Sequence, residues 1–140
     1  MIRTRLMAAC AGLVFANAAW GFGAIAVGLP QSVTEDGLAI GISYGQESAE
    51  AASALAIKRC QDFKDAPLST RNLCRTLETF TNQCVSVALD PEAGTPGWGW
   101  AIATSREDAE AGALRMCRST AGAAREKFCE KVNLRCDKTE

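Results

Sequence analysis

The amino-acid sequence predicts an α/β (α+β) domain that is cross-linked by disulfide bonds. We expect this domain to be a tandem duplication of one strand–strand–helix–strand unit, with pseudo-twofold symmetry. Two observations support this fold class. Residues 48–60 recur without a gap at 105–117, each time as an Ala-rich segment that begins with Ser and ends with Cys. Segments of alternating apolar residues, typical of strands, lie in the same order around both copies. Neither half could bury its sheet face alone, so we expect the halves to pack on each other.

The first repeat spans residues about 20–83. Two alternating segments, 20–27 and 38–44, predict strands, and the Asp36-Gly37 turn signal between them favours a hairpin. The next segment predicts a helix capped by Ser48, and residues 73–80 predict a third strand. The buried stripe of this helix is expected to contain Ala49, Ala52, Ala56 and Cys60.

The second repeat spans residues about 84–136 and follows the same plan. Its helix begins at Ser105, with Asp108 in a position typical of a capping box. A turn-rich loop is expected at 90–97. Strands are expected at 84–89, 98–103 and 128–134, and residues 137–140 are expected to form a solvated tail.

Residues 1–18 have the pattern of a secretory signal peptide. Arg3 and Arg5 precede an apolar run that ends in the small-residue motif Ala16-Asn17-Ala18. Cleavage after Ala18 leaves 19–140 as a single duplicated domain, exported to the periplasm or the medium. A lipoprotein acylated at Cys10 is the less favoured alternative, because the apolar core mostly follows that cysteine.

The mature chain is slightly acidic. The 15 basic residues of the sequence fall to 13 after cleavage, against 16 acidic residues, which gives a net charge of about −3. A nucleic-acid-binding protein usually carries a basic face, so this class is disfavoured. No segment after the signal is long and apolar enough to predict a membrane span.

Six of the seven cysteines remain after cleavage, and an even number in a small exported domain predicts disulfides. A metal site is the alternative, but the chain has no histidine and no Cys-x-x-Cys pair. The repeat predicts equivalent bridges at the ends of the two helices. Cys84 and Cys136 are interpreted as corresponding positions that a pseudo-twofold axis brings together; a Cys74–Cys84 bridge is the competing map. The predicted pairs are Cys60–Cys74, Cys117–Cys129 and Cys84–Cys136.

Several motifs resemble domain-of-unknown-function family 4189, a family of small exported bacterial proteins. They are Trp20-Gly-x-Gly-Ala-Ile-Ala, the two Ser…Cys helices, Asn82-Gln83-Cys84-Val-Ser-Val-Ala and Gly97-Trp-Gly-Trp-Ala. The resemblance covers residues 20–136 and implies export, a duplicated α/β fold and a role at the cell envelope or toward other organisms. It supplies no catalytic residues. The segment between Cys60 and Cys74 is longer than is usual in the family.

Few residues offer catalytic chemistry. Without histidine, neither Ser–His nor Cys–His nucleophiles can form, and Gly41–Gly45 lacks the lysine and threonine of a phosphate loop. Carboxylates remain. Glu78 is the one acid within an apolar predicted strand, although a solvent-facing position is the simpler interpretation. Asp90 and Glu92 flank a turn and could contact calcium, but such pairs usually serve turn formation.

Trp98 and Trp100 stand two residues apart and therefore share one face of a strand, as Trp20 and Phe22 do in the first repeat. Exposed, they would form a recognition surface. Buried, they would fill the space between the sheet and the Ala-rich helices, and this second interpretation is favoured.

These observations predict a non-enzymatic binding protein of the bacterial envelope or secretome that uses no cofactor and no metal. Its partner is expected to be a protein or an envelope component. Two alternatives stay open: a periplasmic inhibitor or immunity-type protein, and a carboxylate-based hydrolase. A cleft lined by two carboxylates would favour the hydrolase.

Overall fold

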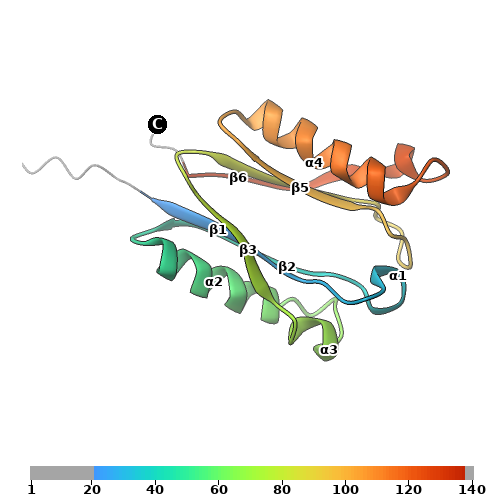
Figure 1. Cartoon of the computed structure of the whole chain (residues 1–140), viewed down its shortest axis with the longest axis horizontal. Helices are drawn as coiled ribbons and strands as arrows, with labels where there is room; N and C mark the ends of the chain where they lie inside the picture. The colour runs from blue at the N-terminus through green and yellow to red at the C-terminus, as the bar shows by residue number, and fades with distance from the viewer. Residues whose placement is uncertain (1–20, 138–140) are drawn as a thin grey trace, which may run out of the picture.

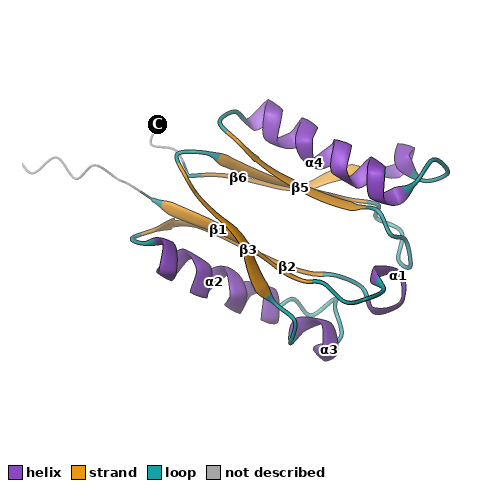
Figure 2. Cartoon of the chain, in the orientation of Figure 1, coloured by secondary structure: helices purple, strands orange, loops and turns teal. Residues whose placement is uncertain are grey.

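The computed structural model describes residues 21–137. The predicted signal peptide, Cys10 and Trp20 lie outside the described residues. The chain forms four layers, in which two sheets face each other and each carries one long helix on its outer side (Figures 1 and 2). Strands precede and follow each of these helices, so a helix and its sheet come from the same half of the chain.

The first half forms an antiparallel sheet of order β2-β1-β3. Helix α2 covers this sheet, and two single-turn helices, α1 and α3, occupy its connections. The elements are β1 (Phe22–Gly28), α1 (Val33–Asp36), β2 (Ala39–Gln46), α2 (Ala49–Gln61), α3 (Leu68–Arg71) and β3 (Arg75–Thr81).

The second half repeats this plan as an antiparallel sheet of order β5-β4-β6 covered by α4. Each half also carries a register shift at the same place, between Ile25 and Ala26 in β1 and between Val87 and Ala88 in β4. The predicted duplicated α+β fold is therefore confirmed. The elements are β4 (Cys84–Leu89), β5 (Trp98–Ala103), α4 (Arg106–Ala121), the short 3₁₀ helix η1 (Glu126–Phe128) and β6 (Glu130–Cys136).

The outer face of each sheet consists mainly of small residues, which let its helix approach closely. Ser48 and Ser105 cap the two helices by accepting the N–H groups of Ala51 and Asp108 through their hydroxyl oxygens. The predicted stripe on α2 is confirmed at three of its four positions, and Ala49 is only half-buried. The helix residues buried at these interfaces are Ala52, Ala56 and Cys60 in α2, and Ala109, Ala113, Cys117 and Ala121 in α4.

The larger apolar side chains lie between the two sheets. Strand residues alternate between faces, so the sequence of β1 sends Ala24 and Ala26 toward α2 but Ile25 and Val27 toward the other sheet. This shared core joins the halves. Its buried members are Ile25, Val27, Ile42, Phe80, Val85 and Val87.

Three disulfides link the six cysteines of the described chain, in the pairs that the repeat predicts. Cys60–Cys74 and Cys117–Cys129 tie the end of each long helix to the segment before the following strand, with Cα separations of 5.9 and 6.0 Å. They are equivalent bridges in the two halves.

The third bridge, Cys84–Cys136, pairs the expected cysteines but forms for a different structural reason. Its cysteines are directly opposed on the neighbouring strands β4 and β6. The equivalent pair in the first sheet is Phe22 opposite Thr81. Both cysteines therefore belong to the second half, and the interpretation that a twofold axis brings corresponding positions together was wrong, because the first half has no cysteine at either place.

The element boundaries differ from the predictions mainly near the cysteines. The last strand begins two residues later than expected, because Phe128 lies in η1 beneath the cations of Arg125 and Lys127. Asp137 was expected to be solvated but is half-buried: its N–H donates to the Gln83 carbonyl (2.8 Å) and its carboxylate accepts the Gly45 N–H (3.3 Å). Burial raises the pKa of the Asp137 carboxyl.

Candidate functional site

The tryptophans singled out in the sequence belong to the core between the sheets. Trp98 and Trp100 are half-buried and pack against the cluster that includes Val85 and Val87. We expected their rings between the sheet and α4, and that placement was wrong. Gly99 occupies the α4 side of β5, where even a Cβ atom would overlap the Ala113 carbonyl and the Cys117 amide. The two rings therefore project from the opposite face.

Trp98 also lines a hollow of about 390 Å³ at one end of the two-sheet core. Segments 33–38 and 89–98 form most of its wall. Several of the residues that line it are acidic: Glu35, Asp36, Asp65, Asp90 and Glu92.

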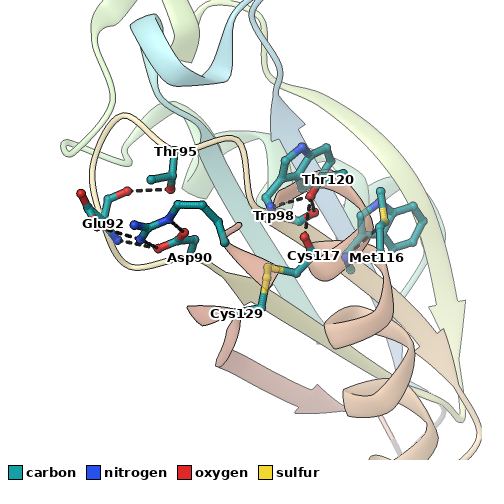
Figure 3. The surroundings of a disulfide bond; sticks show 10 residues. Asp90, Glu92, Thr95, Trp98, Met116, Cys117, Thr120 and Cys129 are labelled. Atoms are coloured by element: carbon teal, nitrogen blue, oxygen red, sulfur yellow. Dashed lines mark hydrogen bonds and ion pairs between the residues drawn. A yellow bond between two sulfur atoms is a disulfide. The ribbon is translucent and has the colours of Figure 1, made fainter. Parts of the chain in front are cut away.

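Asp90 anchors the 90–97 loop through hydrogen bonds. Its buried carboxylate accepts two hydrogen bonds from the Arg125 guanidinium, at 2.6 and 2.9 Å, and Arg125 also contacts the Glu92 carboxylate at 2.7 Å. The hydrogen bond from Arg125 holds the pKa of Asp90 below its usual value. Figure 3 shows this arrangement beside the Cys117–Cys129 disulfide. In the described part of the chain, no three acidic or cysteine side chains are grouped so that they could hold a metal ion.

Glu78 is exposed on β3, which is the simpler of the two positions considered for it. It lines neither the end hollow nor the groove described next. The structure therefore does not bring Glu78 and Asp90 together. The carboxylates that do share a hollow line the end hollow, and two of them, Asp90 and Glu92, are paired with Arg125.

A second concavity runs between β2 of the first sheet and β6 of the second, and we call it the β2–β6 groove. Its outer part has a volume of about 390 Å³ and its inner part about 220 Å³. The two parts share Ile40, Ile42, Phe63 and Asn133. The remaining outer residues are Gly41, Tyr44, Arg59 and Arg135, and the remaining inner residues are Val87, Leu89 and Val132.

Two arginines from opposite halves meet at the outer part of the β2–β6 groove. The guanidinium carbon of Arg59, from α2, lies 5.7 Å from the ring centre of Tyr44, and that of Arg135, from β6, lies 5.9 Å away. Arg59 also donates a hydrogen bond of 2.6 Å to the Ile42 carbonyl. Tyr44 is 44% exposed. The lining contains no carboxylate, so its charge is positive, in contrast to the acidic end hollow.

This arrangement can bind but offers little chemistry of its own. The inner part is an apolar recess that suits an aliphatic or aromatic side chain. The outer part presents guanidinium groups, which pair with carboxylates or phosphates through charge-assisted hydrogen bonds. The two parts adjoin, so one ligand with an apolar and an anionic group could contact both.

The sequence patterns mark none of the groove residues as functional. Tyr44 was placed in a predicted strand, and it is the only tyrosine of the chain. Phe63 lies in the segment between Cys60 and Cys74 that was recognised as unusually long. Arg135 fell just beyond the predicted last strand. The missing information was tertiary, because β2 and β6 are distant in sequence and meet only when the sheets stack.

None of the described helices combines the length and the apolar composition that a membrane crossing requires. The family model described as "Domain of unknown function (DUF4189)" matches residues 22–136. No curated protein and no solved structure matches the chain.

Proposed function

Since the chain belongs to the DUF4189 family, whose description names no activity, we propose that it acts as an exported binding protein and that the β2–β6 groove is its recognition site. The observation that carries this proposal is the combination of an apolar recess with two arginines around an exposed tyrosine. Tyrosine and arginine are the residue types that dominate binding energy in protein interfaces.

Export is part of the proposal. Three disulfides in a domain of this size are typical of proteins that fold in an oxidising compartment. The predicted signal peptide supports the same compartment. The partner is then a protein or another component of the periplasm, the envelope or the medium. If that partner is an enzyme, the domain acts as its inhibitor or as an immunity-type protein.

The proposal is tested by affinity capture from an envelope extract with the folded, oxidised domain. Tyr44→Ala should lose the partner that the parent retains. Phe128→Ala is a matched control, because Phe128 is 43% exposed and also lies beneath two cations, those of Arg125 and Lys127, but lines no part of the groove. If both variants lose the partner equally, or if both retain it, the result would count against the groove as the recognition site.

The hydrolase alternative has its own test. Glu78→Gln should leave any hydrolytic activity of the purified domain unchanged, since Glu78 is exposed and outside both hollows. Loss of a defined activity in a folded Glu78→Gln protein would replace the binding proposal with an enzymatic one.

A further inference from the structure

We infer that the β2–β6 groove binds an extended, acidic segment of a partner protein, which adds as a strand to the open edge of β2. The inference rests on the proposed function and specifies the chemical class of its ligand. It comes from a difference between the two halves of the duplicated fold. Both halves have an equivalent edge strand, but the side chains of the long helix cover the backbone groups of these two strands to different extents.

In the second half, α4 side chains cap the edge of β5. The N–H of Trp98 donates to the Thr120 hydroxyl oxygen at 2.9 Å, and that hydroxyl lies 2.7 Å from the Trp98 carbonyl oxygen. The N–H of Trp100 points to the Met116 sulfur at 3.5 Å. Figure 3 shows Thr120 and Met116 beside this edge. Three of the four outward backbone groups of Trp98 and Trp100 are thus occupied, and covering an edge in this way is a common protection against edge pairing.

Strand β2 is the equivalent edge in the first half. Ile40 and Ile42 stand opposite Val27 and Ile25, as Trp98 and Trp100 stand opposite Leu89 and Val87. The Arg59 hydrogen bond to the Ile42 carbonyl shows that the backbone of Ile42 points away from β1. Ile40, two residues earlier, points the same way, because successive residues of a strand alternate in hydrogen-bond direction.

No equivalent cap protects β2 within residues 21–137. The position of Met116 is taken by Arg59, which has no acceptor for the Ile42 N–H. Helix α2 ends at Gln61, whereas α4 continues to Ala121, so the turn that carries Thr120 has no counterpart. The chain leaves the helix at Asp62, and Phe63 lies in the groove wall instead. The N–H and C=O groups of Ile40 and the N–H of Ile42 therefore face the groove without a side-chain partner.

Charge and shape then select the ligand. A strand added to β2 would place alternate side chains toward the inner recess, whose lining is apolar apart from Asn133. Its remaining side chains would lie within reach of Arg59 and Arg135, which favour carboxylates. Addition of an extended peptide to an open sheet edge is an established way of binding, in which backbone hydrogen bonds give affinity and side-chain pockets give specificity. A second copy fits less well, since pairing β2 with β2 would bring four arginines together.

The test uses the oxidised mature domain and a blocked octapeptide that alternates valine with aspartate. Amide spectra and hydrogen exchange should show binding at Ile40 and Ile42, with slower exchange at both amides. The same peptide with lysine in place of aspartate should not bind. Arg59→Ala and Arg135→Ala should each weaken binding roughly tenfold, as expected for loss of one charge-assisted contact. Arg118→Ala, an exposed arginine in the last turn of α4, is the matched control and should bind like the parent.

Backbone methylation distinguishes strand addition from contacts of side chains alone. Two further octapeptides carry N-methyl groups on the valines only or on the aspartates only. One of them should fail to bind and the other should bind, because a strand pairs with its neighbour through alternate residues. Binding of both, failure of the unmethylated peptide, or equal binding of the lysine peptide would overturn the inference.

The remaining outcomes separate the inference from the proposed function. If Tyr44→Ala loses a captured partner but no acidic peptide protects Ile40, the groove is the recognition site and the strand-addition inference fails. Sedimentation tests the second copy: a parent dimer that protects the Ile40 and Ile42 amides without peptide would assign the β2 edge to self-association and overturn the inference.

Discussion

Gly41 and Gly99 occupy equivalent positions beneath the two long helices. A Cβ atom at Gly41 would overlap the Ala56 carbonyl and the Cys60 amide, and one at Gly99 would overlap the Ala113 carbonyl and the Cys117 amide. In both halves the helix backbone thus rests directly on a strand glycine. This contact explains why the helix faces are Ala-rich and why the large side chains gather between the sheets.

Gly41→Ala and Gly99→Ala should therefore each destabilise the fold, by about 3 kcal/mol, because the helix has to move off the sheet. Denaturant unfolding with the disulfides intact measures this. Gly45→Ala is the control: Gly45 has a positive φ of 66°, but an added methyl group there would meet no atom within 4 Å, so only backbone strain of about 1 kcal/mol is expected. A similar loss of unfolding free energy in all three variants would show that the helix contact is not the cause of the destabilisation.

Trp98→Ala and Trp100→Ala should each lower the unfolding free energy by about 3 kcal/mol, because both rings are half-buried against the core between the sheets. Leu68→Ala, at a side chain that is 62% exposed, should change it by less than about 0.5 kcal/mol. A tryptophan variant that melts like the parent and yet no longer captures the partner would make the aromatic pair a recognition surface.

Asp90→Asn should lower the melting temperature at pH 7, and this difference should shrink as the pH falls below the unfolded pKa of Asp90. The Arg125 hydrogen bond lowers the pKa of Asp90 in the folded protein, so the charged pair stabilises the fold above the unfolded pKa of about 4. That stability is lost as the pH falls through the lower folded pKa, where the parent also becomes neutral. Asp62→Asn is the control, since its ion pair with Lys58 is exposed and should contribute little. A parent–variant difference that does not shrink between pH 7 and acid pH would exclude the ion pair as its source.

Export predicts a defined N-terminus. Protein recovered from the periplasm or the medium should begin at Ala19, or within a residue or two of it, because Ala16-Asn17-Ala18 provides the cleavage motif. N-terminal sequencing is the direct measurement. Recovery of chains that still begin with Met1 from the cytoplasm would remove the argument for an oxidising compartment.

Local features of the sequence predicted most of the fold. The Ser caps, the alanine stripes and the two helix-end cysteines act over short distances, and they occur in the same order in both halves. The side of β5 on which Trp98 projects was not predictable in this way, because it depends on the close approach of α4 to Gly99. The reason for the Cys84–Cys136 pairing was also missed, because the two cysteines are 52 residues apart and become opposed only when β6 pairs with β4.

The groove was beyond prediction from sequence for a similar reason. Arg59 and Arg135 are 76 positions apart and belong to different halves, so only the stacking of the two sheets makes them neighbours of Tyr44. The open edge of β2 depends on a further detail, the early end of α2 at Gln61 compared with the end of α4 at Ala121. A helix boundary of this kind is among the least predictable features of a sequence.

All three disulfides lie within one half or the other. Within residues 21–137, the halves are joined by the apolar core, the short connection at Asn82 and Gln83, and a few polar contacts such as the hydrogen bond from the Gly45 N–H to the Asp137 carboxylate. A single half, cut at that connection, keeps its own bridges but exposes the sheet face that the other half covers. We expect the fragment 84–137 to bury that face against a copy of itself, so that it sediments as a symmetric homodimer.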